Sequence, residues 1–120
     1  WLHPIPETLS WMKELKSSGC RIGILTNMAT KFFDLFVSRV FAEHIALADA
    51  LVVSGKAGVS KPDARIYRIM EDRIGVSPEQ ILFFDDNPCN VEGAKSCGWN
   101  AVMFTSTADA RATFAKRSAE

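Results

Sequence analysis

Two adjacent carboxylates follow a short apolar run in the second half of the chain. Asp85 and Asp86 come directly after residues 81–84, Ile-Leu-Phe-Phe. Adjacent carboxylates repel each other, and desolvating either one without a partner costs several kcal/mol. A hard cation relieves the repulsion, and Mg²⁺ prefers carboxylate, water and phosphate oxygens. Asp is also a common helix cap at a strand-to-helix turn. The pair therefore indicates either a magnesium site or a helix cap beside a solvated acid.

A hydroxyl, an amide and an ammonium group also come after apolar runs of the chain. Thr26 and Asn27 follow an apolar run, and Lys61 precedes Pro62 in the segment after the next run. Taken singly, such a Thr is usually a strand former and such a Lys a solvated charge. Together with the acidic pair, the Thr26 hydroxyl, the Asn27 backbone amide and Lys61 supply what a phosphoryl group needs around one crevice. A phosphate loop of the GxxxxGK[ST] kind is absent from the sequence.

The elements that must position these groups alternate along the chain. Apolar runs too short for helices predict strands buried on both faces, at residues 21–26, 50–53, 81–84 and 101–104. Apolar residues at helical spacing predict helices at residues 6–18, 32–40, 61–75 and 90–97, and from residue 107 onward. Alternating strands and helices imply right-handed crossovers. The expected fold is α/β, a doubly wound, Rossmann-like and mostly parallel sheet with helices on both faces, whose ligands bind beyond the carboxyl ends of the strands.

Composition narrows the function classes. The 120 residues carry 14 Lys and Arg against 14 Asp and Glu, so the chain lacks the excess of positive charge that is expected of a protein that binds nucleic acid or of a polybasic membrane binder. No apolar run approaches the ~20 residues that cross a bilayer. The 3 cysteines lack metal-ligand spacing and suit a reducing compartment, so we expect a cytoplasmic protein.

The motifs in their order resemble the haloacid dehalogenase superfamily of phosphohydrolases. Those motifs are Ile-Leu-Thr-Asn ending at Asn27, Lys-Pro-Asp-Ala-Arg-Ile-Tyr from Lys61, and Phe-Phe-Asp-Asp-Asn-Pro-Cys-Asn-Val-Glu-Gly-Ala-Lys across the acidic pair. The stretch from Lys61 to Gly98 looks most like the bacterial branch that acts on glucose-1-phosphate. The resemblance implies a magnesium-dependent phosphatase for a small phosphorylated metabolite, such as a sugar phosphate.

The same resemblance assigns roles to individual residues. It implies that the Thr26 hydroxyl and the Asn27 amide hold the transferring phosphoryl group, and that Lys61 offsets negative charge. It makes Asp86 the direct magnesium ligand, with Asp85 in support. Asn90 lies where many relatives carry a further acid, and we expect structural roles for three neighbouring polar residues, Ser54, Arg65 and Asn87.

The sequence departs from the family at its start. The nucleophile motif Asp-x-Asp, with its first strand, has no counterpart, because residues 1–25 contain only Glu7 and Glu14 as acids, and no helical cap is present. We therefore expect residues 1–120 to be a single core-domain fragment, inactive alone, from the C-terminal part of a longer enzyme. The start at Trp1 rather than Met points the same way. A complementing N-terminal segment, or a homodimer, would complete the sheet.

Two alternatives remain open at this stage. The chain could be a non-catalytic module that uses the same crevice to bind phosphate or a partner protein. It could also serve dehalogenation or another phosphoryl transfer, although dehalogenases of this family need no metal and the acidic pair therefore favours a phosphatase. Fold alone cannot decide among them.

Overall fold

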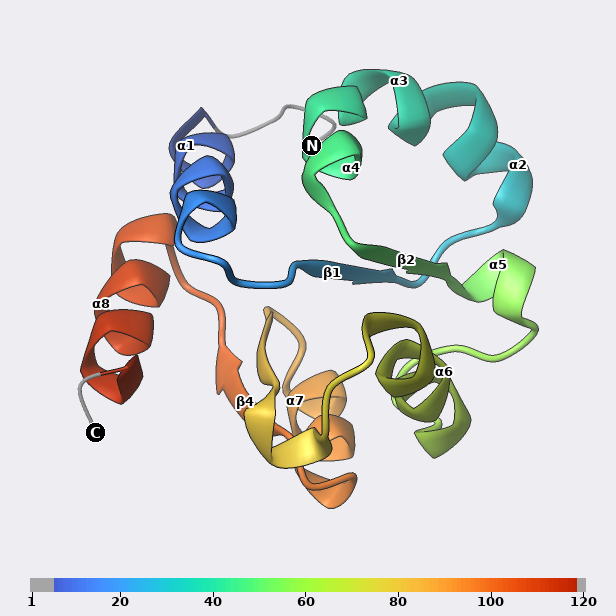
Figure 1. The fold of residues 1–120 in the computed structure, drawn as a ribbon. Coiled ribbons are helices and arrows are strands. Elements are labelled where there is room, and N and C mark those ends of the chain that lie inside the picture. The colour runs from blue at the N-terminus through green and yellow to red at the C-terminus, as the bar shows by residue number, and fades with distance from the viewer. Residues whose placement is uncertain (1–5, 119–120) are drawn as a thin grey trace.

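A computed structural model describes residues 6–118, so Trp1 lies outside the described residues (Figure 1). Its strands are β1 (Gly23–Thr26), β2 (Ala50–Val53), β3 (Leu82–Asp85) and β4 (Asn100–Met103). Its longer helices are α1 (Pro6–Ser17), α6 (Ala64–Ile74), α7 (Pro88–Ser96) and α8 (Thr107–Ser118). Its shorter helical segments are α2 (Thr30–Phe32), η1 (Phe33–Val37), α3 (Ser38–Val40), α4 (Ala42–Leu47), α5 (Ser54–Ala57) and η2 (Pro78–Gln80).

The four strands form two parallel pairs. β1 pairs with β2 and β3 pairs with β4, each in a sheet of 2 strands, and Thr26 lies opposite Val53 while Asp85 lies opposite Met103. The expected α/β class and the parallel pairing are confirmed. Within residues 6–118, however, no hydrogen-bonded ladder joins β1 to β3. The two pairs therefore present one edge each to the space between them.

Helices cover both faces of this arrangement (Figure 1). On one side α6 packs on β1 and β2, and α7 packs on β3 and β4. On the other side Trp11 of α1 contacts both Phe84 of β3 and Phe114 of α8 through edge-to-face rings. The largest buried cluster lies on the α6 side, where Tyr67, Phe83 and Trp99 meet edge to face at centroid distances of 5.1 to 6.1 Å. Such ring pairs add about 0.5–1.5 kcal/mol each beyond area burial.

Two helix predictions are corrected by local contacts. The helix predicted from Lys61 begins instead at Ala64, because the Asp63 carboxylate accepts a hydrogen bond from the backbone N–H of Arg65 and caps the first turn. This leaves Lys61 in the preceding loop. The helix predicted over residues 32–40 is divided, since a π-helical turn separates α2 from α3.

Within residues 6–118, no helix is both long and apolar enough to span a membrane.

Candidate functional site

Lys61 joins the carboxyl ends of β1 and β3. Its Nζ donates to the carbonyl oxygen of Leu25 at 3.2 Å and to Oδ2 of Asp85 at 2.6 Å. The ammonium also lies 5.6 Å from the centroid of the Phe83 ring. The Lys61 and Asp85 side chains are only 9% and 7% exposed. A charge desolvated to this extent is tolerated only when it is paired and hydrogen-bonded, and Lys61 meets both conditions.

Asn27 fixes the backbone of the same lysine. The backbone N–H of Lys61 donates to Asn27 Oδ1 at 2.8 Å, and Asn27 Nδ2 donates to the Lys61 carbonyl at 3.1 Å. This reciprocal pair ties the loop after β1 to the loop before α6. Sequence reasoning gave Asn27 a role only through its backbone amide, because the two residues lie 34 positions apart and no local pattern links them.

Asp85 is held by three donors. Its Oδ1 accepts from the backbone N–H of Asn87 at 2.8 Å, and its Oδ2 accepts from Lys61 and from Asn90 Nδ2, the latter at 3.2 Å. Burial by itself raises the pKa of this carboxyl, but the hydrogen bonds from Lys61 and Asn87 bring the pKa below its ordinary value. Asp85 is therefore ionised at neutral pH.

Asn90, in the first turn of α7, supports Asp85. It is buried, its side chain donates to Asp85, and its backbone carbonyl accepts from the Tyr67 hydroxyl at 2.8 Å. Burial raises the pKa of Tyr67 to about 12, so the hydroxyl keeps its proton and remains a donor. From the sequence, Asn90 could be singled out only because many relatives carry an acid at this position.

Asp86 is exposed at the start of the loop that leads into α7. It makes no hydrogen bond or ion pair with the part of the chain that the structure describes, whereas both oxygens of Asp85 are engaged. Among residues 6–118, no group of 3 or more His, Cys, Asp and Glu could hold a metal ion. Mg²⁺ is commonly bound through one or two carboxylates, with water and substrate phosphate completing the shell. Asp86 and Asp85 fit the protein's share of such a site.

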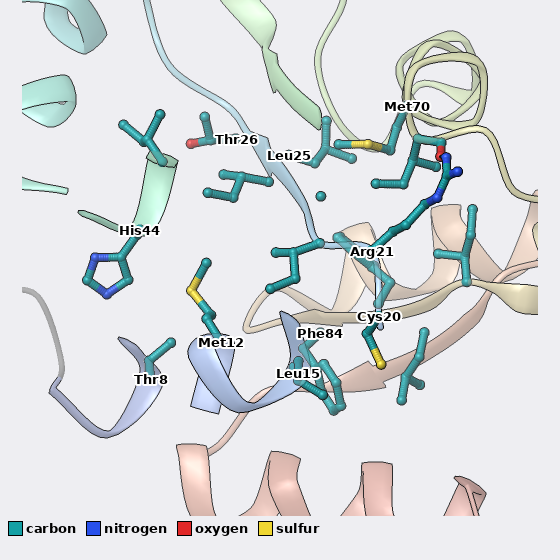
Figure 2. Close-up of a pocket in the computed structure, with 18 of the residues that line it drawn as sticks. Thr8, Met12, Leu15, Cys20, Arg21, Leu25, Thr26, His44, Met70 and Phe84 are labelled. Carbon is teal, nitrogen blue, oxygen red and sulfur yellow. The ribbon is translucent and has the colours of Figure 1, made fainter. Parts of the chain in front are cut away.

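Thr26 is the last residue of β1 and lies next to the Lys61-bound carbonyl of Leu25. It is partly exposed and lines a cavity of about 560 Å³. Figure 2 shows this cavity, with Thr26 and Leu25 along one wall and Phe84 across from them. The structure thus brings Lys61 into direct contact with Leu25 and with Asp85, and Thr26 and Asp86 each come one residue later along the chain.

The other polar residues at the strand ends have structural partners. The Ser54 hydroxyl accepts from the Met28 backbone N–H, at 2.8 Å, and Asn87 caps α7 by accepting from Cys89. Arg65 forms a surface ion pair with Asp63. These contacts agree with the structural roles expected for Ser54, Arg65 and Asn87.

Comparison with known proteins places these residues in a family. The family profile described as haloacid dehalogenase-like hydrolase matches residues 2–98. A Mycobacterium tuberculosis phosphatase is 33% identical over 98 residues, which cover 82% of this chain and 45% of that protein. Haloacetate dehalogenase H-2 of Moraxella is also 33% identical, covering 82% of this chain and 43% of its own length. The structure of a phosphatase of the same family from Thermococcus onnurineus superposes with a TM-score of 0.75 at 24% identity, over 84% of this chain and 46% of that one. This chain spans less than half of each of these proteins.

Proposed function

This chain belongs to the haloacid dehalogenase-like hydrolases, and from that premise we propose that it is the C-terminal portion of a magnesium-dependent phosphatase. The substrate in this proposal is a small phosphomonoester of the sugar-phosphate class. The attacking group is an aspartate outside these 120 residues, which forms an aspartyl-phosphate that water then hydrolyses.

The observation that carries the proposal is the Lys61 bridge. One buried ammonium touches the carboxyl end of β1 at Leu25 and of β3 at Asp85. Thr26 and Asp86 are the next residues along the chain after Leu25 and Asp85, and the proposal assigns both to the phosphoryl site at this end of the strands. A phosphoryl group has several oxygens to neutralise, and donors arriving from separate loops can reach different oxygens.

Each residue then has a defined task. Lys61 supplies fixed positive charge, and its Asn27-clamped backbone keeps that charge in place without reorganisation during the reaction. The Thr26 hydroxyl donates to a phosphoryl oxygen. Asp86 would hold Mg²⁺ with Asp85 in support, and the cation would polarise the phosphoryl oxygens. Asn90 and Asn87 keep Asp85 oriented through their hydrogen bonds.

We also propose a cytoplasmic location for the protein. The 3 cysteines are all free in the structure, and free thiols suit a reducing compartment such as the cytoplasm.

The competing function is a non-catalytic module that binds phosphate or a protein at the same edge. The two differ in whether bond cleavage follows binding.

A chimaera tests this proposal. Residues 1–120 are joined to the part of the Mycobacterium tuberculosis phosphatase that they do not match, and hydrolysis of p-nitrophenyl phosphate is measured with Mg²⁺. We expect turnover that falls by about two orders of magnitude in Asp86→Asn. Asp72→Asn, an exposed acid on α6, is the matched control and should change nothing.

Three results would contradict the proposal. A folded chimaera that binds phosphate without cleaving the ester supports the binding module instead. Activity on 2-chloropropionate but not on phosphate esters supports a dehalogenase. Equal activity in Asp86→Asn and in Asp72→Asn removes the acidic pair from the site.

A further inference from the structure

The loop after β1 carries one of the donors proposed for the phosphoryl group. It consists of residues 27–29, between Thr26 at the end of β1 and Thr30 at the start of α2. Asn27 is exposed, and its backbone N–H donates to no group in the part of the chain that the structure describes. This N–H can therefore donate to a ligand, and its usefulness depends on how firmly the loop is held.

Ser54 binds the next residue of the loop at both of its backbone polar groups. The Ser54 hydroxyl oxygen accepts from the Met28 N–H at 2.8 Å and donates to the Met28 carbonyl oxygen at 3.2 Å. The N–H of Gly55 donates to the same carbonyl at 3.0 Å. A hydroxyl has a single proton, and here the carbonyl of Met28 takes it. The buried Ser54 side chain is therefore engaged with the loop and has no proton left for a substrate.

Gly55 lets the loop and α5 approach more closely than a side chain would allow. A Cβ added to Gly55 would lie 2.4 Å from the Thr30 backbone nitrogen, 2.8 Å from Thr30 Oγ1 and 2.9 Å from the Met28 carbonyl oxygen. Two of these atoms belong to the backbone, so relief requires the backbone itself to move. Figure 1 shows α5 at the end of β2, beside the segment that leads from β1 into α2.

The strand register explains why Ser54 and Gly55 meet this loop. Thr26 lies opposite Val53, and both are the last residues of their parallel strands. Parallel strands end at the same edge of a sheet, so the residues that follow them leave side by side. Ser54 and Met28 nevertheless lie 26 positions apart in the sequence, and no local pattern links them.

Asn27 is thus held from several directions while its own N–H stays unpaired. It follows directly on β1, its side chain exchanges hydrogen bonds of 2.8 and 3.1 Å with the Lys61 backbone, and Ser54 holds the residue after it. A donor that is fixed before the reaction needs no reorganisation during it, which is the basis of stabilisation by preorganised N–H groups.

We infer that Ser54 and Gly55 are positioning residues that keep the Asn27 backbone N–H ready to donate to the transferring phosphoryl group. This inference rests on the proposed phosphatase function. Neither residue touches the substrate. Ser54 acts through its two hydrogen bonds to Met28, and Gly55 acts through its own bond to Met28 and its close approach to Thr30.

Amide hydrogen exchange on the 120-residue chain tests the hold on the loop. In the wild type the Met28 amide should exchange about tenfold or more slowly than the neighbouring Asn27 amide, because a buried hydroxyl accepts from it. Ser54→Ala should remove this protection and leave the Ile24 amide of β1 protected. Ser54→Thr keeps the hydroxyl and should retain the protection. Ser10→Ala, at an exposed serine on α1, is the matched control and should change nothing.

Turnover by the chimaera tests the effect on the reaction. In Ser54→Ala and Gly55→Ala the kcat for p-nitrophenyl phosphate should fall by about tenfold or more, because the donor is no longer preorganised. The KM should change much less, since the loss concerns the transition state. Across the wild type and the Ser54→Ala, Ser54→Thr and Gly55→Ala variants, kcat should follow the protection of the Met28 amide. A merely structural role would lower stability without this correlation.

Several outcomes would overturn the inference. A wild-type Met28 amide that exchanges as fast as that of Asn27 would do so even if no variant folds. Full kcat in a variant that has lost the protection, or lost kcat in a variant that keeps it, would show that the loop does not transmit the effect. Both results leave the phosphatase proposal standing.

An inactive wild-type chimaera contradicts the phosphatase proposal instead. The positioning role is then decided with inorganic phosphate and Mg²⁺ as the probe. Phosphate should shift the Asn27 amide signal of the wild type, and the shift should be smaller in Ser54→Ala at the same phosphate concentration. An equal shift in both proteins, or no shift in either, would overturn the inference.

Discussion

Lys61→Met removes one partner of a buried ion pair and leaves the Asp85 carboxylate without a cation. The two side chains are 9% and 7% exposed and their charged atoms lie 2.6 Å apart. Removing one partner of such a pair costs about 3–5 kcal/mol, because the remaining charge stays buried. Asp85 keeps its hydrogen bonds from Asn87 and Asn90, so we expect the lower end, about 3 kcal/mol. The clamp from Asn27 persists, because it holds only the Lys61 backbone.

Urea unfolding measures this loss as a fall in the free energy of unfolding. The wild-type pKa of Asp85 is lowered, so its contribution is present above the unfolded value of about 3.9 and is lost as pH falls through the folded value. Without Lys61 the pKa of Asp85 should rise. The difference between variant and wild type should therefore be largest near pH 7 and shrink in acid. A second substitution, Asp85→Asn, should recover part of the loss.

An exposed ion pair provides the control. Lys56 and Asp34 lie 3.0 Å apart, but their side chains are 48% and 54% exposed. Lys56→Met should cost no more than about 1 kcal/mol, because solvent screens the pair. The reasoning is refuted if Lys61→Met costs as little as this control, or if its cost is the same at pH 7 and in acid.

Three further predictions concern other contacts. Burial lowers the pKa of His44, so stability should decline as pH falls below the unfolded value of about 6.5. His44→Phe should remove that decline, measured as the melting temperature at several pH values. A variant whose melting temperature falls with pH as much as that of the wild type would contradict this prediction. Tyr67→Phe removes the hydroxyl that donates to the Asn90 carbonyl and should lower the free energy of unfolding in urea by about 0.5–1.5 kcal/mol. A neutral result would mean that this hydrogen bond contributes nothing to stability. Gly55→Ala would bring a Cβ within 2.4 Å of the Thr30 backbone nitrogen, so the melting temperature should fall, and an equally stable variant would show that this approach can relax.

The strands were predictable because each is apolar along its whole length. Helices on both faces remove the need for alternation, so residues 50–53 and 81–84 read as continuous apolar runs. The second run starts and ends one residue later in the structure, as β3, because Asp85 still pairs with Met103. Strand limits depend on the partner strand, and a single run does not contain that information.

The residue types of the candidate site could be read from the sequence, but the contacts among them could not. Thr26, Lys61 and Asp85 were recognisable from their places after or between apolar runs. The hydrogen bonds between the Asn27 side chain and the Lys61 backbone could not be recognised, because they depend on how the loop after β1 and the loop before α6 lie against each other. The division into two separate sheets could be expected only from the missing first strand of the family, since composition and periodicity within the chain say nothing of a neighbour outside it.

Residue-resolved amide hydrogen exchange on the free chain tests the central claim that β1 and β3 face each other with unpaired edges. The amides of Ile24 and Phe83 point to β2 and β4 and should exchange slowly. The amides of Leu25 and Phe84 point away from β2 and β4, into the cavity between β1 and β3, and should exchange faster. Uniform protection along both strands would mean that β1 pairs directly with β3, and would contradict the division into two separate sheets.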